Sequence, residues 1–269
     1  MKEITSRDNQ WVRMAHSLKK KKGRQEQSRF LAEGYRLLAD AIRVGIMDGI
    51  CFVTEKGMHH EGFDAFLAEG ETLGWTFFRV TDSVYDKIKD TGNPQGMAAM
   101  LPLFPYTLQV LDTLESDRPV LYLEDIQDPG NLGTILRTAA ASNGAAVLLS
   151  EGSVDVYNDK AIRSAMGAIF KVPVIQHVTL DDLLAFRRRS GRLLLGTAPL
   201  GKVRYTDAPY EKPVILAFGN EGNGLSRTLQ EQCDALITIP MKPDTESLNL
   251  SLSAGIILYK AWEINGFKE

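Results

Sequence analysis

Two spacings of apolar residues alternate along this chain, and together they predict an α/β fold. Short runs that are apolar throughout indicate strands, whereas apolar residues three and four positions apart indicate helices. After an amphipathic helix over 5–18, such runs and helices follow one another through the first hundred residues. The predicted strands are 30–34, 49–53, 76–80 and 96–103, and the predicted helices are 35–44, 63–73 and 83–89. This order is typical of a small α/β domain.

A second alternation begins after a connector at 104–118. Its first strand, 120–123, is apolar throughout, which is expected of a mostly parallel sheet covered by helices on both faces. The predicted strands are 120–123, 145–149, 172–175, 193–196, 214–218 and 235–239, and the predicted helices are 131–142, 159–170 and 180–188. The sequence therefore predicts one domain at 1–103, a linker at 104–118 and a second domain at 119–269.

The segment from Ile239 to Trp262 changes character half-way. Pro240 and Pro243 each remove a backbone donor, so its first half cannot be regular. From Ser247 onward the spacing predicts a helix that buries one face. That face consists of Leu248, Leu252, Gly255, Ile256 and Tyr259. Taken alone, this segment is best explained as a capped helix of the core.

Composition excludes several classes of protein. At 269 residues the chain is above the usual size of one domain. It has no apolar run of the ~18 residues that a membrane span needs, and its start lacks the apolar stretch of a secretory signal. Two cysteines far apart and four histidines without a metal-binding spacing predict no metal site. We expect a cytoplasmic protein.

Charge is distributed unevenly. The net charge is −3, but residues 1–29 hold nine Lys and Arg against three acidic residues. This segment predicts a basic, RNA-binding arm on a mildly acidic body. Its candidate RNA-binding residues are Lys19, Lys20, Lys21, Lys22 and Arg24. The alternative, which has equal weight, is the solvated end of a helix.

Two loops follow predicted strands at the end where ligands bind in parallel sheets. After 120–123 comes Asp128-Pro129-Gly130-Asn131-Leu132-Gly133, with Arg137 six residues beyond Asn131 on an apolar, small-residue helix. An arginine there calls for an anionic partner such as phosphate, or an ion pair with Asp125 or Glu124. After 214–218 comes Gly219-Asn220-Glu221-Gly222-Asn223-Gly224, whose glycines allow a tight turn. The pattern matches neither a dinucleotide-binding nor a phosphate-binding loop.

These loops, in this order and ahead of Ile239-Pro240-Met241 and Glu246-Ser247-Leu248-Asn249-Leu250-Ser251, resemble the SpoU/TrmH family of RNA ribose 2′-O-methyltransferases. That family is part of the SPOUT superfamily. The resemblance is strong over about 118–269. Residues 1–103 resemble, more loosely, the family's RNA-binding domain.

The resemblance implies a deep trefoil knot in the C-terminal domain and a homodimer formed through it. It implies S-adenosylmethionine as cofactor, which the resemblance places in the knot. Its expected contacts are Thr197, Gly219, Asn220, Glu221, Ile239, Met241 and Leu248. A structural role for Glu221, with its carboxylate bonded to loop amides, is equally open.

The same resemblance implies the catalytic residues Asn131, Arg137, Ser247 and Asn249. Guanidinium loses a proton only with great difficulty, so Arg137 is a better clamp and electrostatic stabiliser than a base. The expected activity is methylation of a ribose 2′-hydroxyl in structured RNA, with ribosomal RNA favoured. The alternatives are a transfer RNA methyltransferase and a non-catalytic RNA-binding protein whose α/β domain senses a nucleotide.

Overall fold

The computed structural model describes residues 1–113, 117–244 and 247–268, so Glu246 of the third motif lies outside the described residues. The chain divides into two compact units. The first comprises Met1–Pro105 with Tyr157–Arg163, and the second comprises Tyr106–Val156 with Ser164–Glu269. The segment Tyr157–Arg163 groups with the first unit, although the sequence places it inside the second domain.

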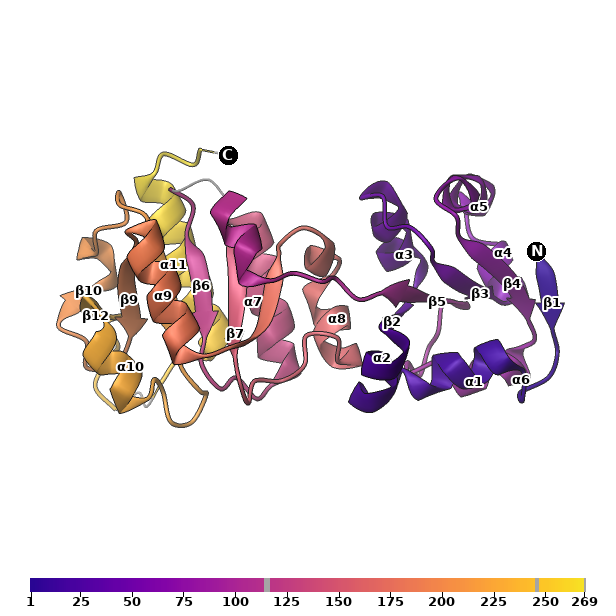
Figure 1. Cartoon of the computed structure of the whole chain (residues 1–269), viewed down its shortest axis with the longest axis horizontal. Coiled ribbons are helices and arrows are strands. Elements are labelled where there is room, and N and C mark those ends of the chain that lie inside the picture. The colour runs from indigo at the N-terminus through magenta and orange to yellow at the C-terminus, as the bar shows by residue number, and fades with distance from the viewer. Residues whose placement is uncertain (114–116, 245–246, 269) are drawn as a thin grey trace. The chain divides into compact units, whose positions relative to one another are not determined.

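A five-stranded sheet forms the centre of the first unit (Figure 1). Its order is β1-β4-β3-β5-β2, with β1, β4 and β3 parallel and β5 antiparallel to both of its neighbours. The strands are β1 Lys2–Ile4, β2 Arg29–Glu33, β3 Ile50–Val53, β4 Thr76–Val80 and β5 Met97–Pro102. The helices are α1 Gln10–Ser17, α2 Lys21–Gln27, α3 Tyr35–Arg43, α4 Glu55–Met58, α5 Phe63–Thr72 and α6 Asp82–Ile88.

Helices pack through apolar side chains on both faces of this sheet. Val12, Ala15 and Leu18 of the α1 segment pack with Val84 and Ile88 of α6 over Phe52 and Phe78. On the other face, α3 lies against α5, whose Gly70 leaves room for Phe77. The two-sided coverage explains why the middle strand β3 is buried at all four positions.

The basic segment is not an arm. Lys19 to Lys22 belong to the turn between α1 and α2 and to the start of α2, and the segment begins with a strand, β1. The sequence missed both elements, because β1 is only three residues long and α2 is almost entirely polar.

The second unit contains a seven-stranded sheet that is parallel throughout, in the order β10-β12-β9-β11-β6-β7-β8. The strands are β6 Val120–Leu123, β7 Ala146–Ser150, β8 Val174–Val178, β9 Leu193–Thr197, β10 Val203–Arg204, β11 Val214–Phe218 and β12 Ala235–Thr238. The α-helices are α7 Pro129–Ala141, α9 Leu180–Ser190, α10 Arg227–Gln232 and α11 Leu250–Ile264. Between α7 and α9 lies α8 Asp159–Ala165, most of which groups with the first unit. The 3-10 turns are η1 Leu108–Thr113, η2 Ala168–Phe170 and η3 Tyr205–Asp207.

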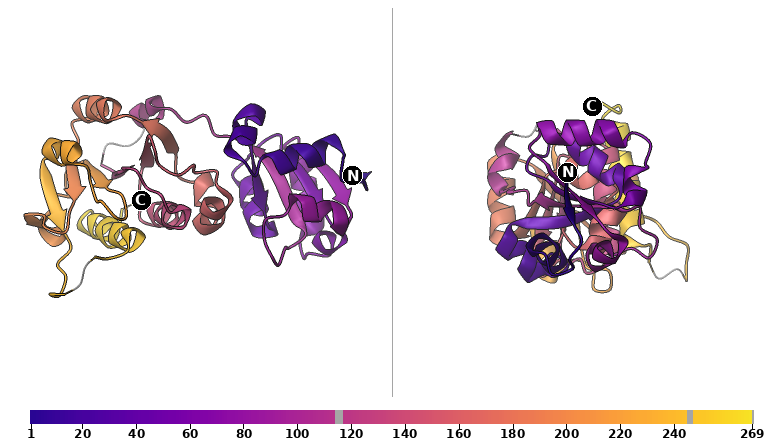
Figure 2. Two further views of the ribbon diagram at one scale, coloured as in Figure 1. Left: turned by 90° about the horizontal axis from the view of Figure 1, so that it is seen from below. Right: turned by 90° about the vertical axis from the view of Figure 1, so that its right-hand side faces the viewer.

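Helices cover both faces of this sheet, as the wholly apolar strands predict (Figure 2). Leu183 and Phe186 of α9 and Leu229 of α10 pack on one face, and α7 and α11 lie against each other on the other face. The mostly parallel α/β sheet expected from the sequence is confirmed. The trefoil knot stays a prediction.

One prediction about the helices of the second unit is wrong. The face of α11 expected to be buried includes Leu252 and Tyr259, which are 53% and 46% exposed. The buried residues of α11 are instead Ala254, Ile257, Leu258 and Ala261. In α7, Arg137 lies on the exposed side of the helix. The periodicity was right in both helices, but it does not tell which side meets the sheet.

Candidate active site at the carboxyl edge of the parallel sheet

A cavity of about 560 Å³ opens at the carboxyl ends of β9, β11 and β12, next to the start of α11. Its lining combines apolar side chains, such as Ile237 and Ile257, with backbone groups of the glycine-rich loop after β11. All seven residues expected to contact the cofactor line it, and so does Ser247. Those seven are Thr197, Gly219, Asn220, Glu221, Ile239, Met241 and Leu248.

The conformation of the loop after β11 depends on Gly219 and Asn220. A Cβ on Gly219 would lie 2.0 Å from the backbone carbon of Gly224, so any larger residue would displace the backbone. Asn220 and Gly224 exchange two backbone hydrogen bonds across this turn. The side chain of Asn220 accepts from the N–H groups of Gly222 and Asn223 and donates to the Asp125 carbonyl at 2.8 Å. Asn220 therefore shapes the loop and ties it to the segment after β6.

Glu221 fastens the same loop to the start of α7. Its carboxylate accepts from the N–H groups of Gln127 and Asp128 at 3.1 and 3.0 Å, and from Asn131 Nδ2 at 3.2 Å. Burial would raise the pKa of Glu221, but the hydrogen bonds from Asp128, Gln127, its own N–H and Asn131 outweigh it and lower the pKa. The carboxylate is the form that accepts these bonds.

Asn131 links Glu221 to the start of α11. Its Nδ2 donates to Glu221, and its Oδ1 accepts from Asn249 Nδ2 at 3.0 Å. Asn249 is also the N-cap of α11, where its Oδ1 accepts from the N–H groups of Ser251 and Leu252. Asp128 caps α7 in the same way, at the N–H groups of Gly130 and Asn131. The side-chain amide of Asn131 thus connects the start of α7 to the loop after β11 and to the start of α11, although Asn131 and Asn249 lie 118 residues apart in the sequence.

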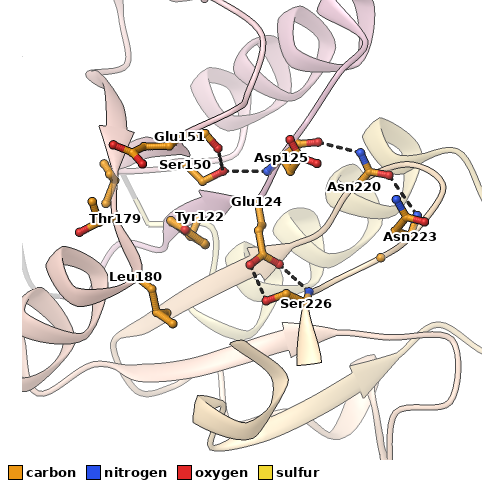
Figure 3. Close-up of a pocket in the computed structure, with 12 residues that line it drawn as sticks. Tyr122, Glu124, Asp125, Ser150, Glu151, Thr179, Leu180, Asn220, Asn223 and Ser226 are labelled. Atoms are coloured by element: carbon orange, nitrogen blue, oxygen red, sulfur yellow. Dashed lines mark hydrogen bonds between the residues drawn. The ribbon is translucent and has the colours of Figure 1, made fainter. Parts of the chain in front are cut away.

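On the other side of the loop lies a second cavity of about 410 Å³, shown in Figure 3. Glu124 reaches across it and accepts from both the N–H and the hydroxyl of Ser226 at 2.7 Å. The two cavities share Asn220, Asn223 and Gly224 in their walls. The Glu124 bridge therefore holds the loop from the face opposite to the Glu221 contacts. The sequence did not single out Glu124 for this role.

Arg137 is placed apart from these residues. It does not line the cavity, and among the described residues no hydrogen bond or ion pair involves its guanidinium. The ion pair considered with Asp125 or Glu124 is absent from the described part of the chain, because Asp125 accepts from Gln127 and Glu124 from Ser226. Its charge is therefore free to meet an external anion.

The candidate RNA-binding residues divide into two groups. Arg24 is only 6% exposed, and its guanidinium donates to the Leu18 carbonyl at 2.8 Å. Lys19 donates to the Lys89 carbonyl and pairs with Asp90 at 3.0 Å. These two join α1, α2 and the end of α6, so we remove them from the candidate contacts. Lys20, Lys21 and Lys22 are exposed and stay candidates.

Comparison with known proteins identifies the family behind this arrangement. The model of the SpoU rRNA methylase family matches residues 118–259, more than half of the chain. The chain belongs to the SpoU rRNA methylase family. A model of the MRM3-like substrate-binding domain matches residues 9–99 of this SpoU family member.

Relatives of this SpoU family member match along almost its whole length. The 23S rRNA (guanosine(2553)-2′-O)-methyltransferase RlmP of Bacillus subtilis is 32% identical, over 96% of this chain and 98% of its own. The crystal structure of an AdoMet-bound rRNA methyltransferase from Sinorhizobium meliloti is 30% identical, with a TM-score of 0.88 and 98% of each chain covered. A crystal structure of an RNA 2′-O ribose methyltransferase is 28% identical, with a TM-score of 0.79, and covers 98% of this chain and 99% of its own.

Among the described residues there is no helix long and apolar enough to cross a membrane. The described side chains also contain no group of three or more His, Cys, Asp or Glu that could hold a metal ion.

Proposed function

We propose that this protein transfers a methyl group from S-adenosylmethionine to a ribose 2′-hydroxyl of ribosomal RNA. The observation that carries the proposal is the cavity beside the Asn131 network, at the carboxyl edge of a parallel sheet. Family membership supports it, as do the names of two matching relatives, RlmP and an RlmB from Ralstonia nicotianae, which are both 23S rRNA guanosine 2′-O-methyltransferases. Transfer RNA is the alternative substrate, and a cytoplasmic location belongs to the same proposal.

The cavity fits the proposed cofactor in size and in chemistry. Its volume of about 560 Å³ is within the range of small-molecule sites. Ile237, Ile239 and Leu248 provide apolar walls for an adenine ring. The tight approach of Gly219 to Gly224 leaves backbone groups as the lining of the glycine-rich side. S-adenosylmethionine supplies an activated methyl group on a sulfonium, so the protein needs to contribute mainly position and charge.

The chain's own residues would place the ribose and stabilise its oxygen. Asn131 is held in one orientation by Asn249 and by Glu221, and Glu221 lines the cavity, so the Asn131 amide is preorganised. Ser247 lines the cavity and offers a further hydroxyl. The Arg137 guanidinium is exposed and planar, with several N–H donors and no acceptor. Its role in the proposal is to bind a phosphate of the RNA and to stabilise the negative charge that develops on the ribose oxygen.

We also propose a homodimer formed through α7 and α11. Leu252 and Tyr259 project from α11 into solvent, and α11 packs beside α7. Exposed apolar side chains of this size on one helix are characteristic of an interaction surface.

The proposed activity is tested by incubating the purified protein with labelled S-adenosylmethionine and 23S rRNA transcribed in vitro. We expect label in a single ribose, located by resistance of the adjacent bond to alkaline cleavage. Transfer RNA transcripts run in parallel test the alternative substrate. Binding of RNA and cofactor without any transfer would instead support the non-catalytic alternative.

A further inference from the structure

An aromatic column in the first unit ends at an exposed ring. His60 stacks on Tyr35 with ring centroids 3.7 Å apart and planes inclined by 21°. Tyr35 contacts Phe66 at 5.6 Å, and Phe66 meets Trp75 and Phe77 edge-on in the core. Burial decreases along the column, from Phe66 in the core through the half-buried Tyr35 to the exposed His60. An aromatic column that begins in the core thus reaches the surface.

The local backbone is shaped to hold this column. Gly62, with φ +85°, has no Cβ, and a Cβ there would lie 2.7 Å from the Tyr35 hydroxyl. The Tyr35 N–H donates to Gln95 Oε1 at 2.9 Å, which fixes the start of α3. His60 Nδ1 lies 2.7 Å from the Glu61 carbonyl, and a carbonyl can only accept. Nδ1 therefore carries the hydrogen, which fixes the plane of the imidazole.

The groups around the column can meet a polyanion. Arg36 follows Tyr35 in the chain, is exposed, and has no hydrogen bond or ion pair among the described residues. Lys56 is exposed and donates to the Pro94 carbonyl at 2.8 Å. Of the acids close to His60 in the sequence, Glu55 is paired with Arg79 at 2.8 Å, whereas Glu61 and Asp64 have no cation partner in the described structure. An exposed aromatic ring next to cations is the combination that binds unpaired bases and their phosphates.

We propose that His60 is a stacking platform for an unpaired base of the RNA substrate, with Tyr35 as its support. The inference rests on the proposed function, and it adds the class of RNA structure that the first unit selects. A base can stack on His60 only with a face that no neighbouring base covers, and both faces of an internal base are covered in a regular duplex, so the preferred site is a loop or a bulge. The RNA contacts predicted from the sequence are Lys19 to Lys22 and Arg24, which provide charge without selecting unpaired bases.

The test compares three variants of the full-length protein. His60→Ala removes the platform, His60→Phe keeps a flat ring, and His59→Ala is the matched control, since His59 is an adjacent exposed histidine with no ring contact among the described aromatic pairs. Affinity for in vitro transcribed 23S rRNA is measured by filter binding, together with KM and kcat for methyl transfer.

We expect His60→Ala to weaken RNA binding by about fivefold to a hundredfold, the usual effect of losing one stacked ring. KM for RNA should rise in step, while kcat, S-adenosylmethionine affinity and the melting temperature stay unchanged. His60→Phe and His59→Ala should bind like the unaltered protein. Equal RNA affinities of His60→Ala and His59→Ala would overturn the inference.

Filter binding also separates this inference from the proposed activity. If the unaltered protein binds 23S rRNA without methylating it, the proposed function fails, but a selective loss in His60→Ala still supports the platform. If methylation is normal and His60→Ala binds normally, the platform alone fails. Absence of binding by the unaltered protein would overturn the inference as well.

Discussion

At the scale of single residues, Glu221 makes the hydrogen bonds that hold the glycine-rich loop against the start of α7. One carboxylate accepts N–H groups from two backbone positions and from Asn131, while its own loop lines the cavity. An amide at this position would turn at least one donor toward another donor. The structural role for Glu221 is therefore supported by its contacts, and it also lies where a cofactor would bind.

We expect Glu221→Gln to lower the free energy of unfolding at neutral pH by an amount on the order of 1 kcal/mol. The melting temperature should fall accordingly. The pKa of Glu221 is lowered in the folded protein from its ordinary value of 4.5. The stabilisation is therefore complete above pH 4.5 and is lost as the pH falls through the lower, folded pKa. Thermal melts of both proteins between pH 3 and pH 7 should converge only at the acid end. A constant difference would mean that the carboxylate charge is irrelevant.

Replacing Arg137 should affect catalysis rather than stability, unlike the replacement of Glu221. Since the side chain is exposed and has no partner among the described residues, Arg137→Ala should leave the melting temperature and S-adenosylmethionine affinity nearly unchanged. Methyl transfer should fall by roughly a hundredfold or more, as expected when one preorganised stabilising group is lost. Arg137→Lys should also be slow, because an ammonium cannot form the two parallel bonds of a guanidinium.

Single-turnover transfer to 23S rRNA, calorimetry with the cofactor and a melting curve provide the three readouts for Arg137. A variant that melts early and loses cofactor would mark the arginine as structural. Near-normal turnover would remove it from the proposed mechanism.

At the scale of elements, the sequence predicted that helices α7 and α11 exist but not which of their sides is buried. Apolar spacing located both helices, but Leu252 and Tyr259 of α11 are apolar and exposed. A residue that meets a partner has the same chemistry as one that meets the core, so spacing cannot distinguish them. Arg24 is the reverse case, a charged residue that is buried because its guanidinium satisfies the Leu18 carbonyl.

The strands were easier to predict than the site. Strands such as β6 and β11 are buried at every position, and a continuous apolar run shows this directly. The bonds from Asn131 to Glu221 and Asn249 join residues 90 and 118 positions apart. No local pattern of residues predicts contacts over such separations. Only the resemblance of the three motifs to a family predicted that Asn131, Glu221 and Asn249 belong to one site.

The exposed face of α11 leads to a prediction about assembly. Leu252→Asp should convert a homodimer into monomers, because a carboxylate enclosed in an apolar interface would lose its hydration. Light scattering after size-exclusion chromatography measures the mass directly. Met47→Asp is the matched control, since Met47 is 61% exposed and lies in the first unit. If both variants keep the mass of the unaltered protein, α11 is not the interface; if the unaltered protein is already monomeric, there is no dimer to disrupt.

At the scale of the whole molecule, the two units divide the proposed work. The cavity, the Asn131 network and Arg137 all belong to the second unit. The exposed lysines of α2 and the His60 column belong to the first. The cofactor site should therefore be complete without the first unit, whereas recognition of RNA should need both.

This division predicts that residues 106–269, produced alone, bind S-adenosylmethionine with the affinity of the full-length protein. Every residue that lines the cavity lies within this range. The range also contains Tyr157–Arg163, which would lose the unit with which it groups. Calorimetry measures the affinity, and circular dichroism first establishes that the fragment is folded. A folded fragment without affinity would show that the site draws on the first unit.

A second variant keeps this prediction testable if the fragment does not fold. Replacing Lys20, Lys21 and Lys22 by glutamine in the full-length protein alters only exposed side chains of the first unit. RNA affinity should fall, and its dependence on salt should become shallower by roughly one unit of slope for each phosphate that is no longer neutralised. S-adenosylmethionine affinity should stay the same, because no cavity residue is changed. A matching decrease in cofactor affinity would contradict the division of work, and unaltered RNA affinity at low salt would show that these lysines are only a solvated helix end.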